Sequence, residues 1–120
     1  MLLAAQILTG LVLLIHVYIF LLETVLFRSR GMRVFGFPRD QADMYAPLMS
    51  NQGCYNGFLA VALALGLFYP DPAIAQAFVW YGLGCVAVAG IWGAITAKVR
   101  IIFIQTIPAA LAMGAWLLAG

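Results

Sequence analysis

Four long apolar segments alternate with short polar connections along the chain, and they cover about residues 2–27, 45–69, 73–97 and 99–119. A helix that crosses a hydrocarbon core of roughly 30 Å needs about 20 mostly apolar residues, so each segment is long enough for one crossing. The only connection with substantial polar content covers residues 28–44. The pattern predicts an all-α integral membrane bundle of four transmembrane helices that forms one domain over residues 1–120.

The composition narrows the class of protein. Hydrophobic residues make up 66% of the 120 residues and charged residues only 8%, against roughly 25% charged residues in an ordinary soluble domain. A soluble domain of this size exposes most of its side chains and needs more charge to stay in water. We therefore exclude a soluble enzyme, a nucleic-acid binder and a disordered tail, and we expect the lipid bilayer to surround the chain.

All six basic residues lie in or next to two of the three predicted connections. They are Arg28, Arg30, Arg33 and Arg39 in the first connection and Lys98 and Arg100 at the very short third connection. With four crossings, these two connections share one side of the membrane and both termini share the other. Because Lys and Arg are retained on the cytoplasmic side, the pattern predicts a basic cytoplasmic loop at residues 28–44 and termini on the outer side.

Polar side chains within the predicted spans gather at one depth, in the cytoplasmic half of the bilayer. His16 and Glu23 are seven residues apart, close to two helical turns, so they share a face of the first span. At a similar depth on the other spans, or at their cytoplasmic end, lie Asn51, Gln52, Tyr55, Asn56, Lys98 and Gln105. Because an intramembrane polar group needs a partner or a cavity, we expect a cytoplasm-facing pocket that binds a small amphipathic or lipid-like molecule.

Small residues in the second span favour close helix packing. Gly53 and Gly57 form a GxxxG pattern, which lets another helix approach that side closely, within one subunit or between subunits. Four short helices enclose little volume, so we expect a homo-oligomer, either a trimer or a dimer.

The residue types suit acid–base chemistry better than metal chemistry. His16 and Glu23 are the candidate catalytic acid and base, and the remaining polar residues are candidate ligand-binding groups. The chain has one histidine, and its other acidic residues lie outside the spans, so no metal site is predicted. No motif identifies a cofactor, and the sequence leaves open whether the protein is an enzyme.

Other interpretations of the same residues remain open. The carboxamides can act only as hydrogen bonds between helices, and Glu23 can pair with Arg28 or Lys98. A small transporter would need a polar path through the outer half of the bilayer, and that half is almost purely apolar. A purely structural membrane protein is the third alternative.

Three stretches of the chain closely resemble a family of small bacterial membrane proteins, the domain of unknown function 1304. They are IHVYIFLLETVLF at 15–27, NQGCYNGFLA at 51–60 and GIWGAITAKVRIIFIQTIPAALA at 90–112. The resemblance covers essentially the whole chain and includes His16, Glu23 and the segment from Gln105 to Pro108. It implies a multi-pass protein of the bacterial inner membrane and assigns no biochemical role.

The chain is more remotely similar to the membrane-associated eicosanoid and glutathione metabolism proteins. Four short spans, a basic first cytoplasmic loop and the NQxC stretch at Asn51 carry this similarity. It implies a trimer that holds glutathione and a lipid-like substrate between subunits, with Asn51, Gln52 and Asn56 facing the ligand. The chain departs from that family at Tyr81, which stands alone where the family has an arginine and tyrosine set.

Overall fold

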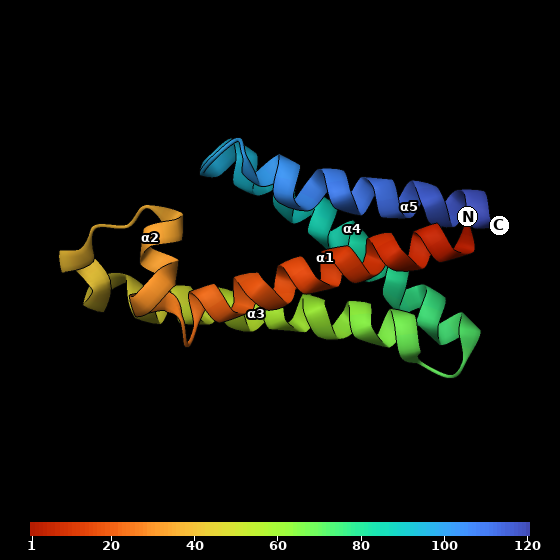
Figure 1. Ribbon diagram of the computed structural model, residues 1–120, viewed down its shortest axis with the longest axis horizontal. Coiled ribbons are helices and arrows are strands. Elements are labelled where there is room, and N and C mark those ends of the chain that lie inside the picture. The colour runs from red at the N-terminus through yellow and green to blue at the C-terminus, as the bar shows by residue number, and fades with distance from the viewer. The chain divides into compact units, whose positions relative to one another are not determined.

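The computed structural model describes all 120 residues, and every regular element in it is helical (Figure 1). The long helices are α1 (Leu2–Glu23), α3 (Ala42–Phe68), α4 (Pro72–Thr96) and α5 (Ile107–Ala119). The short elements are the π-helices η1 (Phe27–Gly31) and η3 (Ile102–Thr106), the single turn α2 (Met32–Phe35) and the 3-10 turn η2 (Arg39–Gln41). The predicted all-α class is confirmed.

Three helical segments, and not the four expected, are long and apolar enough to cross a membrane. They are Leu2–Glu23, Pro72–Thr96 and Ile102–Ala119. The helix α3 has 27 residues, so its length suffices. Its composition is the reason for the difference, because Asn51, Gln52 and Asn56 lie in the middle of the helix, before the apolar run from Phe58 to Phe68.

The chain divides into two compact units. The first unit contains Met1–Ile15 and Leu59–Gly120, and the second unit contains His16–Phe58. The first unit therefore holds the beginning of α1, the end of α3 and all of α4 and α5. The second unit holds the rest of α1 and α3 with the segment that connects them.

The core of the first unit draws on all four long helices. Its buried side chains are Val12, Leu63, Val79, Leu83, Val86, Ala109 and Ala112. At the turn between α3 and α4, the Asp71 side chain accepts hydrogen bonds from the backbone N–H groups of Ala73 (2.9 Å) and Ile74 (3.3 Å). Pro72 starts the helix where an N–H group would have no helical partner, so the same turn also begins α4.

A glycine lets η3 and α4 approach closely. A Cβ atom added at Gly90 would overlap the Thr106 hydroxyl and would lie 2.8 Å from the Thr106 backbone nitrogen. The Thr106 hydroxyl donates a 2.9 Å hydrogen bond to the Ala87 carbonyl oxygen of α4. The last span departs from regular α-helix at the π-helix η3, which ends two residues before Pro108.

The N-terminal part of α1 and the C-terminal part of α5 meet in the first unit. The Trp116 indole N–H donates a 2.9 Å hydrogen bond to the Thr9 hydroxyl, which itself donates to the Ala5 carbonyl oxygen at 2.8 Å. Thr9 is fully buried. Because α1 begins and α5 ends within a few residues of this contact, both termini lie at the same end of the first unit, as the N and C labels in Figure 1 show.

The Gly90 contact predicts a selective loss of stability. We expect Gly90→Ala to lower the free energy of unfolding by about 1–3 kcal/mol, the usual cost of overpacking. Thermal unfolding of the purified protein in detergent measures the change. Gly84→Ala on the same helix is the control, since nothing lies within 4 Å of a Cβ atom there. Equal stability of Gly90→Ala and Gly84→Ala would contradict the close approach.

Candidate functional site

A hydrogen bond between α1 and α3 joins two of the predicted site residues in the second unit. The Asn56 Nδ2 atom donates to the Glu23 Oε1 atom at 2.6 Å, across 33 positions of sequence. The same nitrogen donates to the Gln52 carbonyl oxygen at 3.2 Å. The Glu23 side chain, which is 6% exposed, therefore meets a hydrogen-bond donor from a neighbouring helix.

Glycines on α3 make this short contact possible. A Cβ atom added at Gly53 would lie 2.6 Å from the Thr24 methyl group and 3.1 Å from the Glu23 Cβ atom. At Gly57 an added Cβ atom would lie 3.2 Å from the Phe20 ring. The close helix approach predicted from the GxxxG pattern is confirmed, and the helix that approaches is α1 of the same chain.

The other predicted site residues divide between buried and exposed positions. His16 is fully buried on α1, whereas Asn51, Gln52 and Tyr55 are exposed on α3, Tyr55 by 59%. Lys98, which is exposed, and Gln105, which is half-buried, belong to the first unit. The structure thus brings Glu23 and Asn56 into contact and presents Asn51, Gln52 and Tyr55 on the surface beside Asn56. A pocket that combines all eight residues stays a prediction.

Arg28 pairs with Asp43, so it does not neutralise Glu23. The Arg28 Nη1 atom lies 2.8 Å from the Asp43 Oδ1 atom, and both side chains are largely exposed. The alternative in which Arg28 pairs with Glu23 is therefore wrong. Sequence spacing favoured it because Arg28 is close along the chain, whereas the Asn56 partner comes from a distant segment.

The connection at residues 28–44, expected as a loop, is folded. Gly36 has a backbone φ of 78°, in the left-handed region that glycine adopts without steric cost, and it ends α2. The chain then returns so that the Phe37 ring stacks on Tyr45 with centroids 4.4 Å apart and meets Phe27 edge-on at 5.8 Å. The sequence signal for this fold was the glycine between two phenylalanines, which the polar composition concealed.

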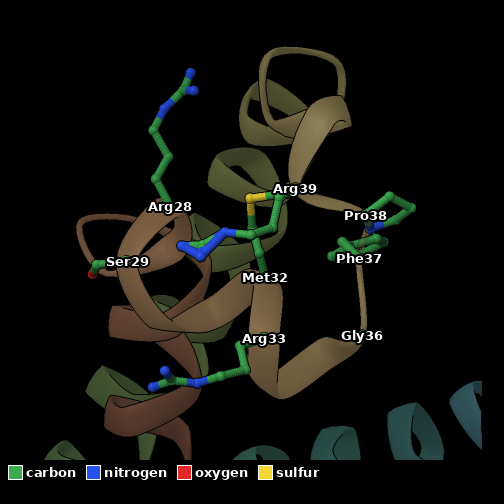
Figure 2. A pocket seen from close by; sticks show the side chains of 8 residues that line it. All are labelled: Arg28, Ser29, Met32, Arg33, Gly36, Phe37, Pro38 and Arg39. Carbon is green, nitrogen blue, oxygen red and sulfur yellow. The ribbon is translucent and has the colours of Figure 1, made fainter.

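A hollow of about 420 Å³ lies in this folded connection. Its lining combines basic and apolar groups: Arg28, Ser29, Met32, Arg33, Gly36, Phe37, Pro38 and Arg39 (Figure 2). None of these residues was among the predicted site residues.

The exposed polar side chains of α3 can recognise a ligand by hydrogen bonding. A carboxamide carries two N–H donors and a carbonyl acceptor, and it keeps them at any physiological pH. Asn51, Gln52 and the Tyr55 hydroxyl can therefore donate to and accept from a polar group. No group of three or more His, Cys, Asp or Glu side chains is placed to hold a metal ion.

Comparison with known proteins gives one match. Residues 10–117 match a protein family of unknown function, DUF1304. The chain belongs to this family. The matched range contains every predicted site residue and the whole folded connection, so the Glu23–Asn56 contact lies within the part of the chain that defines DUF1304. No curated protein and no solved structure matches the chain. The remote similarity to the eicosanoid and glutathione metabolism proteins stays an expectation from sequence.

The Glu23–Asn56 contact predicts a difference between two carboxamides of α3. We expect Asn56→Leu to lower the free energy of unfolding by about 1–3 kcal/mol, because it leaves a buried carboxyl group without its donor. Chemical or thermal unfolding in detergent measures this loss.

Asn51→Leu is the matched control, since the Asn51 side chain is exposed and should change stability by no more than about 0.5 kcal/mol. If both variants lost the same stability, the hydrogen bond from Asn56 to Glu23 would make no specific contribution to the free energy of unfolding.

Proposed function

We propose that this DUF1304 protein is a multi-pass protein of the bacterial inner membrane that crosses the bilayer four times and binds a small amphipathic molecule. The termini support the number of crossings. The Thr9–Trp116 hydrogen bond holds the start of α1 and the end of α5 together, at one end of the first unit. Termini on the same side of a membrane require an even number of crossings, so α3 has to cross together with the three more apolar helices.

The contact with α1 explains how a helix with three carboxamides can cross. Hydropathy values treat a segment as if it were alone in lipid, whereas a polar side chain that finds a partner on another helix no longer meets hydrocarbon. Asn56 has such a partner in Glu23. The remaining two carboxamides, Asn51 and Gln52, lie closer to the start of α3.

The basic residues supply the orientation. Arg28, Arg30, Arg33 and Arg39 lie between α1 and α3, and Lys98 and Arg100 lie between α4 and η3. Under four crossings these connections share one side, which the retention of basic residues identifies as the cytoplasm. Both termini are then periplasmic.

The single observation that carries the binding proposal is the exposed polar face of α3. Asn51, Gln52 and Tyr55 are exposed beside the Glu23–Asn56 pair. An exposed carboxamide in a transmembrane helix costs free energy unless it finds a hydrogen-bond partner, and a bound molecule can supply one. Large apolar side chains flank them on both sides, since Leu48 is 62% exposed and Phe58 60% exposed. A molecule with a polar head and an apolar tail matches this order of groups.

Binding is the role that the exposed face supports, and acid–base catalysis by His16 and Glu23 stays a prediction. Both side chains are buried, so a molecule that reaches α3 from outside meets the carboxamides first. The same face can also contact a second copy of the chain, as expected for a trimer or a dimer.

Native mass spectrometry of the detergent-extracted protein tests this proposal. We expect the wild type to retain a small molecule and Asn51→Leu/Gln52→Leu to lose it, with an affinity about thirty-fold lower for the loss of two hydrogen bonds. Gln6→Leu/Gln76→Leu is the control, because it removes two exposed carboxamides from α1 and α4.

Two results would count against ligand binding at α3. The first is the same bound mass in Asn51→Leu/Gln52→Leu as in the wild type. The second is a loss of subunits in that variant without any bound molecule in the wild type, which would make the face a contact between copies of the chain.

A further inference from the structure

The folded connection after α1 concentrates positive charge that the rest of the second unit does not balance. Four arginines lie within residues 28–39, and the two acidic residues of the connection are Asp40 and Asp43. Asp43 forms an ion pair with Arg28. Arg33 and Arg39 are exposed and form no ion pair, so their charge is available to an anion from outside.

The hollow in this connection has an apolar floor between charged walls. Met32 is buried, 4% exposed, and with Phe37 and Pro38 it supplies the apolar lining. Arg33 and Arg39 belong to the same lining. Figure 2 shows the Arg28 and Arg33 side chains extending away from each other, with Met32 between them. A ligand that fills this space needs an anionic group for the guanidinium groups and apolar atoms for the floor.

Aromatic and backbone contacts hold the hollow in place. The stacking of Phe37 on Tyr45 fixes one wall to the start of α3. Gly31 fixes the other side to α1, because a Cβ atom added there would overlap the Leu22 carbonyl oxygen. The hollow is therefore part of the folded second unit, and binding does not have to order a loose segment first.

The position of the hollow along the chain places it at a membrane surface. The candidate span α1 ends at Glu23, and the first lining residue, Arg28, follows five positions later. Tyr45 stacks on Phe37, which lines the hollow, and tyrosine is enriched at the level of lipid headgroups. Basic clusters directly after a transmembrane helix attract anionic lipids.

We propose that this hollow is a binding site for the phosphate headgroup of an anionic phospholipid. The guanidinium groups of Arg33 and Arg39 donate hydrogen bonds to the phosphate oxygens, for which arginine is well shaped. The first acyl carbons of the lipid lie on Met32 and Phe37. The proposal needs α1 to enter a membrane, and it does not rest on ligand binding at the polar face of α3.

Native mass spectrometry with defined lipids tests this site. Delipidated protein in detergent is titrated with dioleoyl phosphatidylglycerol, and in parallel with dioleoyl phosphatidylcholine and with inorganic phosphate. We expect the wild type to bind the phosphatidylglycerol in preference to the phosphatidylcholine. In Arg33→Gln/Arg39→Gln, the affinity for phosphatidylglycerol should fall about thirty-fold, because each basic group near an anionic lipid contributes about five-fold.

Arg30→Gln/Arg100→Gln is the matched control, since it removes the same net charge from residues outside the hollow. We expect it to keep the wild-type affinity within about three-fold, because charges beyond the contact are screened. Thermal unfolding of both variants verifies that they are folded.

Three results would overturn the proposal. One is an equal loss of affinity in both variants, which would mean that net charge alone attracts the lipid. Another is binding of phosphatidylcholine as tightly as phosphatidylglycerol. The third is displacement of phosphatidylglycerol by an equimolar amount of inorganic phosphate, which would make the hollow a site for a free anion.

Discussion

The hydrogen bond from Asn56 to Glu23 is the interaction on which the arrangement of the second unit depends. A buried carboxyl group and a carboxamide each lose hydration when the helices pack, and each costs free energy unless it meets a partner. Each is the other's partner, and Gly53 and Gly57 remove the side chains that would hold the helices apart. Asn56 and the two glycines of α3 thus serve one contact, because the hydrogen bond forms only at the short distance that the glycines allow.

Close contacts at small residues also shape the first unit. Gly66 on α3 approaches the Val79 backbone of α4, and Gly90 on α4 approaches Thr106 of η3. Such contacts suit helices in lipid, where the hydrophobic effect adds little and packing with hydrogen bonds holds helices together. The Thr9–Trp116 hydrogen bond belongs to the same pattern and sets the relation between the two ends of the chain. Because this hydrogen bond keeps the two ends of the chain together, it favours an even number of membrane crossings.

Local sequence patterns predicted much of the helical structure and part of the candidate site. The lengths of the apolar runs located α1, α3 and α4 within a few residues, and the last run covers η3 together with α5. The GxxxG pattern found the close face of α3. Three features were not predicted from the sequence, because they depend on contacts between distant segments. They are the pairing of Glu23 with Asn56, the π-helices η1 and η3, and the fold of the basic connection around Phe37. The prediction of four sufficiently apolar helices was wrong, since three meet that condition. The predicted second span was accepted as apolar although it contains the carboxamides of α3.

Whether α3 crosses the bilayer is the central claim, and the side on which each connection lies tests it most directly. Single cysteines at Leu2→Cys, Ser29→Cys and Gly120→Cys, with Cys54 and Cys85 replaced by alanine, can be labelled in spheroplasts with a membrane-impermeant maleimide. Four crossings predict that the cysteines at both ends react in intact spheroplasts and that the one at position 29 reacts only after permeabilisation. Labelling of one end with protection of the other would mean an odd number of crossings and would contradict the account.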